Sequence, residues 1–141
     1  MSVKDTQTIA EHIYQTLRLK THPLGVAFYG QIPEWPEKTR RPSQTMKKRI
    51  TICQAVTLAR TYRWTVGLTV EDIVCVPAML AFGHAQAENP QKLLCDFFAR
   101  VGWSKNEEKA ALDVSRMSFM PKGRAKGMLL APLPKGRYFP S

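Results

Sequence analysis

The residues with strand-forming character are confined to three short apolar runs, and this limits the folds open to the chain. The runs cover residues 24–29, 64–68 and 128–133. The first is bounded by Pro23 on one side and Gly30 on the other, which suits a buried strand better than a helix. Longer segments with helical periodicity lie between the runs. The sequence therefore predicts a mixed α/β fold, in which a small sheet of about three strands is covered by four to five helices.

The segments between the runs carry the signals of helix starts and ends. Ile9, Ile13 and Leu17 recur at helical spacing, which predicts an amphipathic helix over residues 5–19. Further helices are expected from Ile52 to about Tyr62, from near Val76, from Pro90 to Val101, and from about Lys105 to Arg116.

Two of these starts carry a capping box, in which a hydroxyl and a side chain three residues later satisfy free backbone N–H groups. The pairs are Thr51 with Gln54, and Ser104 with Glu107. A short turn is expected over residues 71–74.

The length of 141 residues fits one domain, so we predict a single α/β domain over residues 1–141 with a basic surface loop at 31–49 and a polar tail at 134–141. No apolar stretch is long enough for a membrane span. The first residues lack the basic start and apolar core of a secretory signal, and the number of cysteines, three, is odd. A cytoplasmic location with reduced thiols is the expectation.

The net charge of +10 comes from two segments, residues 38–49 and 114–141, which contain basic but no acidic side chains. The residues expected to bind an anion or a partner are Arg40, Arg41, Lys47, Lys48, Arg49, Lys122, Arg124 and Lys126. An acidic protein or an anionic ligand is the predicted partner, and solvated loops that aid solubility are the alternative. Nonspecific nucleic-acid binding is the weaker hypothesis, because neither segment is interleaved with aromatic residues that stack on bases.

Cysteines provide the clearest candidates for chemistry. Cys53 and Cys75 both fall at predicted helix starts, where the positive end of the helix dipole favours the thiolate that binds soft metals or attacks electrophiles. The alternative is that they are buried as small apolar side chains. Cys95 lies among Leu94 and Phe97 on a helix, and a core role is expected for it.

A complete zinc or iron–sulfur site usually needs four ligands, more than the cysteines of this chain supply. A metal at Cys53 and Cys75 would therefore need a histidine, a carboxylate, or ligands from a second chain or a second copy. The chain contains no glycine-rich dinucleotide fingerprint, phosphate loop or nucleophile elbow, so no particular reaction is predicted.

Several short motifs follow one another along the chain. They are Leu19-Lys20-Thr21-His22-Pro23-Leu24-Gly25-Val26-Ala27-Phe28, Ile52-Cys53-Gln54-Ala55-Val56, Leu58-Ala59-Arg60, Glu71-Asp72 with Cys75 and Gly83, and Leu129-Leu130-Ala131-Pro132-Leu133. In these motifs the chain resembles the family called Domain of Unknown Function 169, over about residues 15–135.

The resemblance implies cofactor-binding roles for Cys53, Gln54, Asp72 and Cys75, which match the family's motif positions. Members of that family look longer and continue into a second half with further cysteines. The chain is thus expected to correspond to the N-terminal half, as a fragment, a compact variant or one half of a split protein. The leading hypothesis is a cysteine-dependent cofactor- or metal-binding, redox-associated protein, and the alternative is a non-enzymatic subunit that docks an acidic partner through the basic loops.

Overall fold

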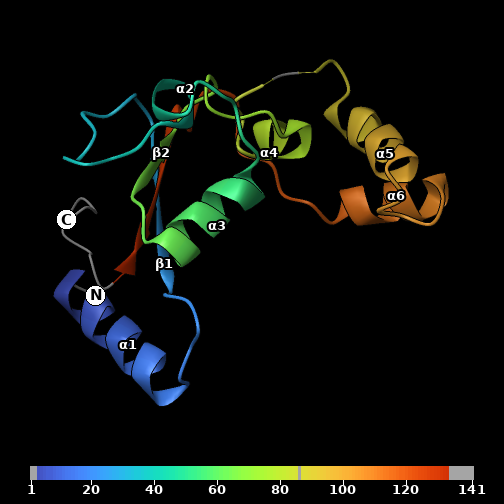
Figure 1. Ribbon diagram of the computed structural model, residues 1–141. Coiled ribbons are helices and arrows are strands. Elements are labelled where there is room, and N and C mark those ends of the chain that lie inside the picture. Colours follow the sequence, from blue (N-terminus) through green and yellow to red (C-terminus); the bar gives the residue numbers. More distant parts are fainter. Residues whose placement is uncertain (1–2, 86, 134–141) are drawn as a thin grey trace. The chain divides into compact units, whose positions relative to one another are not determined.

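A computed structural model describes residues 3–85 and 87–133 (Figure 1). Its elements, in chain order, are α1 (Val3–Thr16), β1 (Leu24–Tyr29), α2 (Pro42–Thr45), α3 (Ile52–Tyr62), β2 (Val66–Leu68), α4 (Val76–Ala81), α5 (Pro90–Arg100), α6 (Glu107–Ser115) and β3 (Gly127–Pro132). The predicted mixed α/β class and the three-stranded sheet are confirmed, and the extra helix is the single turn α2. The chain divides into two compact units. The first unit contains the residues up to Cys75 and those from Lys126 onward, and the second unit is Val76–Ala125.

The first unit is organised around an antiparallel sheet with the strand order β1-β3-β2. The central strand β3 comes from the far end of the chain, and all of its residues are buried. It pairs with β1 over its whole length, with Val26 opposite Leu130, and with β2, where Leu68 lies opposite Met128. A strand from the end of the sequence thus joins two strands from its first half.

Each face of this sheet has its own cover. Side chains alternate along a strand, so Val66 and Leu68 point to the face opposite that of Gly67. Helix α3 packs against all three strands and buries Ala55 and Ala59 (Figure 1).

On the other face, Trp35 lies against the backbone of β2 and β3. A Cβ atom added to Gly67 would come within 2.8 Å of Trp35, and one added to Gly127 within 3.3 Å. The absence of side chains at these two glycines therefore lets the proline-rich loop that carries Trp35 close over the sheet.

The second unit is helical. Leu80 of α4, Leu94 of α5 and Val114 of α6 form its buried core. Cys95 is half-buried and packs against that core, which agrees with the core role predicted for it. Helix α5 ends before Gly102, whose positive φ of 72° is the left-handed conformation typical of a helix C-terminus.

Local predictions differ from the structure at three places. The first helix ends at Thr16 and not at residue 19. Helix α6 is capped by Asn106, because the hydroxyl of Ser104 donates to Asp113 and does not cap the helix. The basic loop 31–49 contains the helical turn α2. The predicted polar tail 134–141 lies outside the described residues, and the single-domain interpretation stays a prediction.

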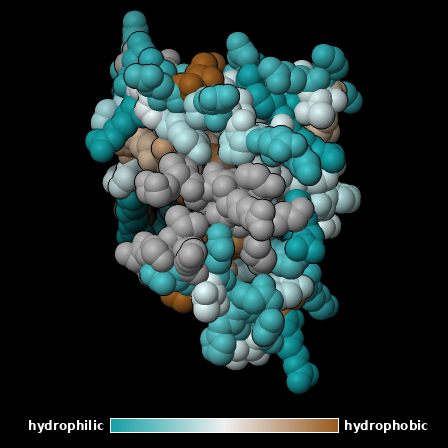
Figure 2. Space-filling view, turned by 90° about the vertical axis from the view of Figure 1, so that its left-hand side faces the viewer, coloured by the Kyte–Doolittle hydropathy of each residue, from teal (hydrophilic) through white to brown (hydrophobic). Residues whose placement is uncertain are grey.

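Apolar side chains remain on the surface of the first unit. The stripe Ile9, Ile13 and Leu17 is exposed, whereas Ala10 on the same helix is buried. On the face drawn in Figure 2 the described residues are mostly hydrophilic, with small separate hydrophobic patches. Within the described part of the chain, every helix is too short or too polar to cross a membrane.

Candidate functional site: a buried carboxylate between two cysteine-bearing segments

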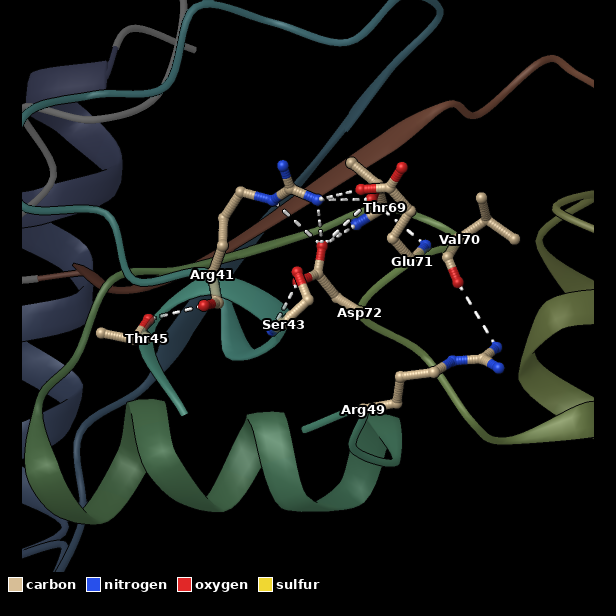
Figure 3. Close-up of polar contacts among 8 residues, drawn as sticks. All are labelled: Arg41, Ser43, Thr45, Arg49, Thr69, Val70, Glu71 and Asp72. Atoms are coloured by element: carbon tan, nitrogen blue, oxygen red, sulfur yellow. Dashed lines mark hydrogen bonds and ion pairs between the residues drawn. The ribbon is translucent and has the colours of Figure 1, made fainter. Parts of the chain in front are cut away.

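Asp72 is the centre of a polar cluster in the first unit (Figure 3). Its side chain is 0 % exposed. The oxygen Oδ1 accepts hydrogen bonds from the Ser43 hydroxyl at 2.6 Å and from the Ser43 backbone N–H at 3.0 Å. The oxygen Oδ2 accepts from Arg41 Nη2 at 2.7 Å and Nε at 3.1 Å, and from the backbone N–H and hydroxyl of Thr69 at 2.9 and 3.0 Å. Both oxygens are therefore fully occupied by donors of the same chain.

Local sequence explains why these donors are available. Pro42 begins α2 and has no N–H, so the first free N–H of that helix belongs to Ser43. Thr69 directly follows the strand β2 and opens the turn that carries Asp72, whose backbone N–H donates to the Thr69 carbonyl at 3.0 Å. Asp72 thereby joins the start of a helical turn to the end of a strand.

The electrostatics of the cluster favour the ionised carboxylate. Burial by itself would raise the pKa of Asp72, but the hydrogen bonds from Ser43, Arg41 and Thr69 outweigh it and hold the pKa below the ordinary value of 3.8. Burial likewise opposes the charge of Arg41, and its hydrogen bond to Asp72 nevertheless raises the pKa of the guanidinium. The two residues form an ion pair in which the carboxylate is fully buried and the guanidinium is partly buried, and the exposed Glu71 adds a contact of 3.3 Å with Arg41 Nη2.

This cluster predicts a particular loss of stability in acid. Because the folded-state pKa of Asp72 lies below its ordinary value of 3.8, its stabilising effect is fully present above that pH and is lost as the pH falls through the lower folded-state pKa. We expect the free energy of unfolding of the wild-type protein to fall more steeply below about pH 4 than that of Asp72→Asn. Urea unfolding at a series of pH values measures both slopes, and equal slopes would contradict this role of Asp72.

Next to the cluster, two segments that are remote in sequence run side by side in the same direction. Ile50 and Ile73 form a parallel bridge, in which the Ile50 N–H donates to the Asp72 carbonyl at 2.8 Å and the Val74 N–H donates to the Ile50 carbonyl at 3.0 Å. Arg49 Nη2 donates to the backbone carbonyl of Val70 at 3.5 Å (Figure 3). It also donates to the backbone carbonyl of Ile73. The start of α3 is therefore fixed to the segment that leads into α4.

The two cysteines follow this bridge directly. Cys53 lies in the first turn of α3 and is exposed, and Cys75 lies immediately before α4 and is half-buried. Both thiols are free. The predicted capping box is confirmed: Thr51 Oγ1 accepts from the Gln54 N–H at 3.2 Å, and the Gln54 side chain accepts from the Thr51 N–H at 2.8 Å.

Of the four predicted cofactor-binding residues, Gln54 and Asp72 are thus engaged in holding backbone segments, while Cys53 and Cys75 retain free thiols. Among residues 3–85 and 87–133, no group of three or more histidine, cysteine, aspartate or glutamate side chains is arranged to hold a metal ion.

Three of the arginines predicted to bind an anion have intramolecular partners. Arg41 pairs with Asp72, Arg49 donates to backbone carbonyls, and the guanidinium of Arg40 lies 3.9 Å from the centroid of the Trp64 ring. The five predicted lysine and arginine positions that remain are exposed: Lys47, Lys48, Lys122, Arg124 and Lys126. Binding of an acidic partner through them stays a prediction.

Sequence reasoning singled out Asp72 but missed its partner Ser43 and assigned Arg41 to anion binding. The pairing of Thr69 with Asp72 was indicated by the sequence, because a threonine three residues before an aspartate is a local capping pattern. Arg41 and Ser43 carried no such signal, since they meet Asp72 only through the fold.

Comparison with known proteins places the chain in one family. The family model described as uncharacterised ArCR, DUF169, matches residues 12–140, nearly the whole chain. No curated protein and no solved structure matches the chain.

Proposed function

This chain belongs to the Domain of Unknown Function 169 family, and we propose that it binds a soft metal ion or a metal cluster through Cys53 and Cys75. The observation that carries the proposal is the parallel bridge between Ile50 and Ile73. Neighbouring strands in such a pairing lie about 5 Å apart. Cys53 and Cys75 follow three and two residues beyond the bridge in the same direction, so the two segments that carry them start side by side at the bridge.

The surrounding contacts support positioning roles for the other motif residues. Gln54 holds the first turn of α3, which carries Cys53. Asp72 holds the turn before Cys75, and its backbone carbonyl accepts the Ile50 N–H. Residues that fix the backbone on both sides of a thiol pair are what a metal site requires, because ligand geometry must be maintained closely.

Two thiolates leave a tetrahedral metal ion with two open positions. We propose that a second copy of the chain supplies its own Cys53 and Cys75, which completes a set of four sulfur ligands. A redox role belongs to the same proposal in the case of an iron–sulfur cluster, whose usual ligands are four cysteine thiolates.

Metal analysis tests the proposal. We expect protein purified without oxygen to contain zinc or iron, or to bind added Zn²⁺, at one site per two chains. Cys53→Ser and Cys75→Ser should each weaken Zn²⁺ binding by more than the roughly 10–100-fold that follows loss of a group that only orients a ligand. The measurements are elemental analysis, a visible spectrum and a calorimetric Zn²⁺ titration.

Cys95→Ser is the matched control, because Cys95 packs against the core of the second unit. It should bind Zn²⁺ as the wild-type protein does. Protein that is metal-free and colourless and does not bind added Zn²⁺ would overturn the proposal. Equal losses of Zn²⁺ affinity in all three cysteine variants would also overturn it.

A further inference from the structure

Residues 38–70 of the first unit carry basic side chains and no acidic ones. The stretch contains no aspartate or glutamate, and the first acids on either side of it are Glu37 and Glu71. Glu71 already contacts Arg41. The basic residues of the stretch are Lys38, Arg40, Arg41, Lys47, Lys48, Arg49, Arg60 and Arg63. Positive charge concentrated in this way attracts polyanions by its long-range field.

The fold brings two aromatic rings to this basic stretch. Arg40 is fixed beside β2, because its N–H donates to the Thr65 carbonyl at 2.8 Å and its carbonyl accepts the Gly67 N–H at 3.1 Å. Its guanidinium then lies 3.9 Å from the centroid of the Trp64 ring. The centroid of the Tyr62 ring lies 5.9 Å from that of Trp64. Aromatic side chains that are not interleaved with residues 38–49 along the sequence therefore join them in space.

The end of α3 determines how the two rings meet. The helix ends at Tyr62, and Arg63 caps it in the left-handed conformation with a φ of 57°, so the chain turns toward β2 between the two rings (Figure 1). The N–H groups of Arg63 and Trp64 both donate to the Leu58 carbonyl. Backbone contacts thus hold Tyr62 and Trp64 next to each other before any ligand binds.

The cluster of Arg40, Tyr62 and Trp64 is accessible to a ligand. Tyr62 is 62 % exposed, and Arg40 is also exposed. Among the described residues, no group accepts a hydrogen bond from the Arg40 guanidinium, which carries five N–H donors. Its contact with the Trp64 ring therefore orients the guanidinium and leaves its donors for a phosphate.

Further positive charge lies next to the cluster. Met46 lines the same shallow depression as Arg40 and Trp64, so the exposed Lys47 that follows it is close by. Lys38 precedes Arg40 by two residues and is exposed as well. The cluster therefore offers cations for more than one phosphate group of the same ligand.

These features fit a single-stranded nucleic acid better than the other polyanions. Proteins that bind single strands combine basic grooves with exposed aromatic rings on which bases stack, whereas the bases of a duplex are already stacked on one another. An acidic protein segment would match the charge, but its apolar side chains would find little to pack against. The residues on either side of Tyr62 are the polar Thr61 and the charged Arg63, both exposed.

We infer that the cluster of Arg40, Tyr62 and Trp64 binds single-stranded nucleic acid, with a base stacked on the Tyr62 ring and phosphates at Arg40 and Lys47. The inference goes beyond the proposed metal site, because it needs neither a cysteine nor a metal ion.

Fluorescence anisotropy of a labelled single strand of about 16 nucleotides, as DNA and as RNA, tests the inference with the full chain in the presence of a chelator. The wild-type protein should bind at about 50 mM salt and more weakly at about 200 mM. Tyr62→Ala should raise the dissociation constant at least about fivefold, because it removes a stacking contact, and should leave the salt dependence unchanged. Tyr62→Phe retains the ring and should bind as the wild type does.

Arg40→Gln tests the phosphate contact separately. It should reduce the slope of the logarithm of the binding constant against the logarithm of the salt concentration by about 0.7, the contribution of one phosphate contact in a single strand. Arg40→Lys retains the charge and should keep the slope of the wild type.

Trp103→Ala is the matched control, since Trp103 of the second unit is 65 % exposed and its ring packs beside Phe97 and Phe98. It should bind the single strand as the wild type does. The double variant Cys53→Ser, Cys75→Ser should also bind normally, which separates this test from that of the metal site.

Three results would overturn the inference. The first is the absence of binding to either single strand at low salt. The second is a Tyr62→Ala variant that binds as tightly as the wild type, or a duplex of the same length that binds as tightly as the single strand, because charge alone then accounts for the binding. The third is displacement of the strand by polyglutamate as efficiently as by unlabelled strand, which would indicate an acidic protein as the partner.

Discussion

Replacing Asp72 with alanine should lower the free energy of unfolding by about 3–5 kcal/mol, the range measured when one partner of a buried ion pair is removed. The variant leaves the charge of Arg41, whose side chain is only 12 % exposed, without its closest partner. It also removes the acceptor for the hydroxyl and N–H groups of Ser43 and Thr69. Unsatisfied buried donors add to the loss.

Glu71→Ala is the matched control for this variant. Glu71 also contacts Arg41 Nη2, but at 3.3 Å and with 74 % of its side chain exposed. Removal of such a surface partner should change the free energy of unfolding by no more than about 1 kcal/mol. Urea unfolding followed by two spectroscopic probes measures both variants.

Ser43→Ala provides an intermediate step, because it removes one hydrogen bond and leaves the ion pair in place. Its expected loss is about 1.5–3 kcal/mol, for a hydrogen bond to a charged group. If Glu71→Ala destabilises the protein as much as Asp72→Ala does, then contact with Arg41 and not burial of the carboxylate determines the stability of this cluster.

Whether a contact could be predicted from the sequence depends on how far apart in the sequence its two groups lie. The capping box of Thr51 with Gln54 joins residues three apart, so the sequence was sufficient to predict it. The strand 24–29 was equally accessible, because its boundaries are marked by Pro23 and Gly30. The donors of Asp72 from Arg41 and Ser43 lie 31 and 29 residues away, and no local pattern links them.

Where a local pattern misled, a tertiary contact competed for the same group. Ser104 and Glu107 have the spacing of a capping box, but the Ser104 hydroxyl donates to Asp113 at 2.7 Å and Asn106 caps the helix. Tertiary contacts likewise compete with the predicted anion binding of Arg40, Arg41 and Arg49, because each of these side chains has a partner within the fold. Charge counted along a sequence does not reveal which guanidinium groups have partners within the fold.

Gly83 is the second position at which a substitution should strongly destabilise the protein, because backbone atoms from another part of the fold lie close to it. This residue has a φ of 68°, in the left-handed region, and its carbonyl accepts the Gly123 N–H at 3.1 Å. A Cβ atom at this position would lie 2.6 Å from the Pro121 carbonyl oxygen and 2.9 Å from that of Met120. Because the obstructing atoms belong to the backbone, a side-chain rotation cannot relieve the clash. Gly83→Ala must therefore move the segment that holds α4 to the chain after α6.

We expect Gly83→Ala to lower the free energy of unfolding of the second unit by about 2–5 kcal/mol, the sum of left-handed strain and overpacking. Gly102→Ala separates the two causes, because Gly102 has a similar φ of 72° but no atom within 4 Å of an added Cβ. It should lose only the strain, about 1–2 kcal/mol. Hydrogen exchange of the buried amides of α5 and α6 measures the stability of this unit directly. Equal losses in the two variants would mean that the backbone near Pro121 gives way, and that the close approach at Gly83 contributes nothing to stability.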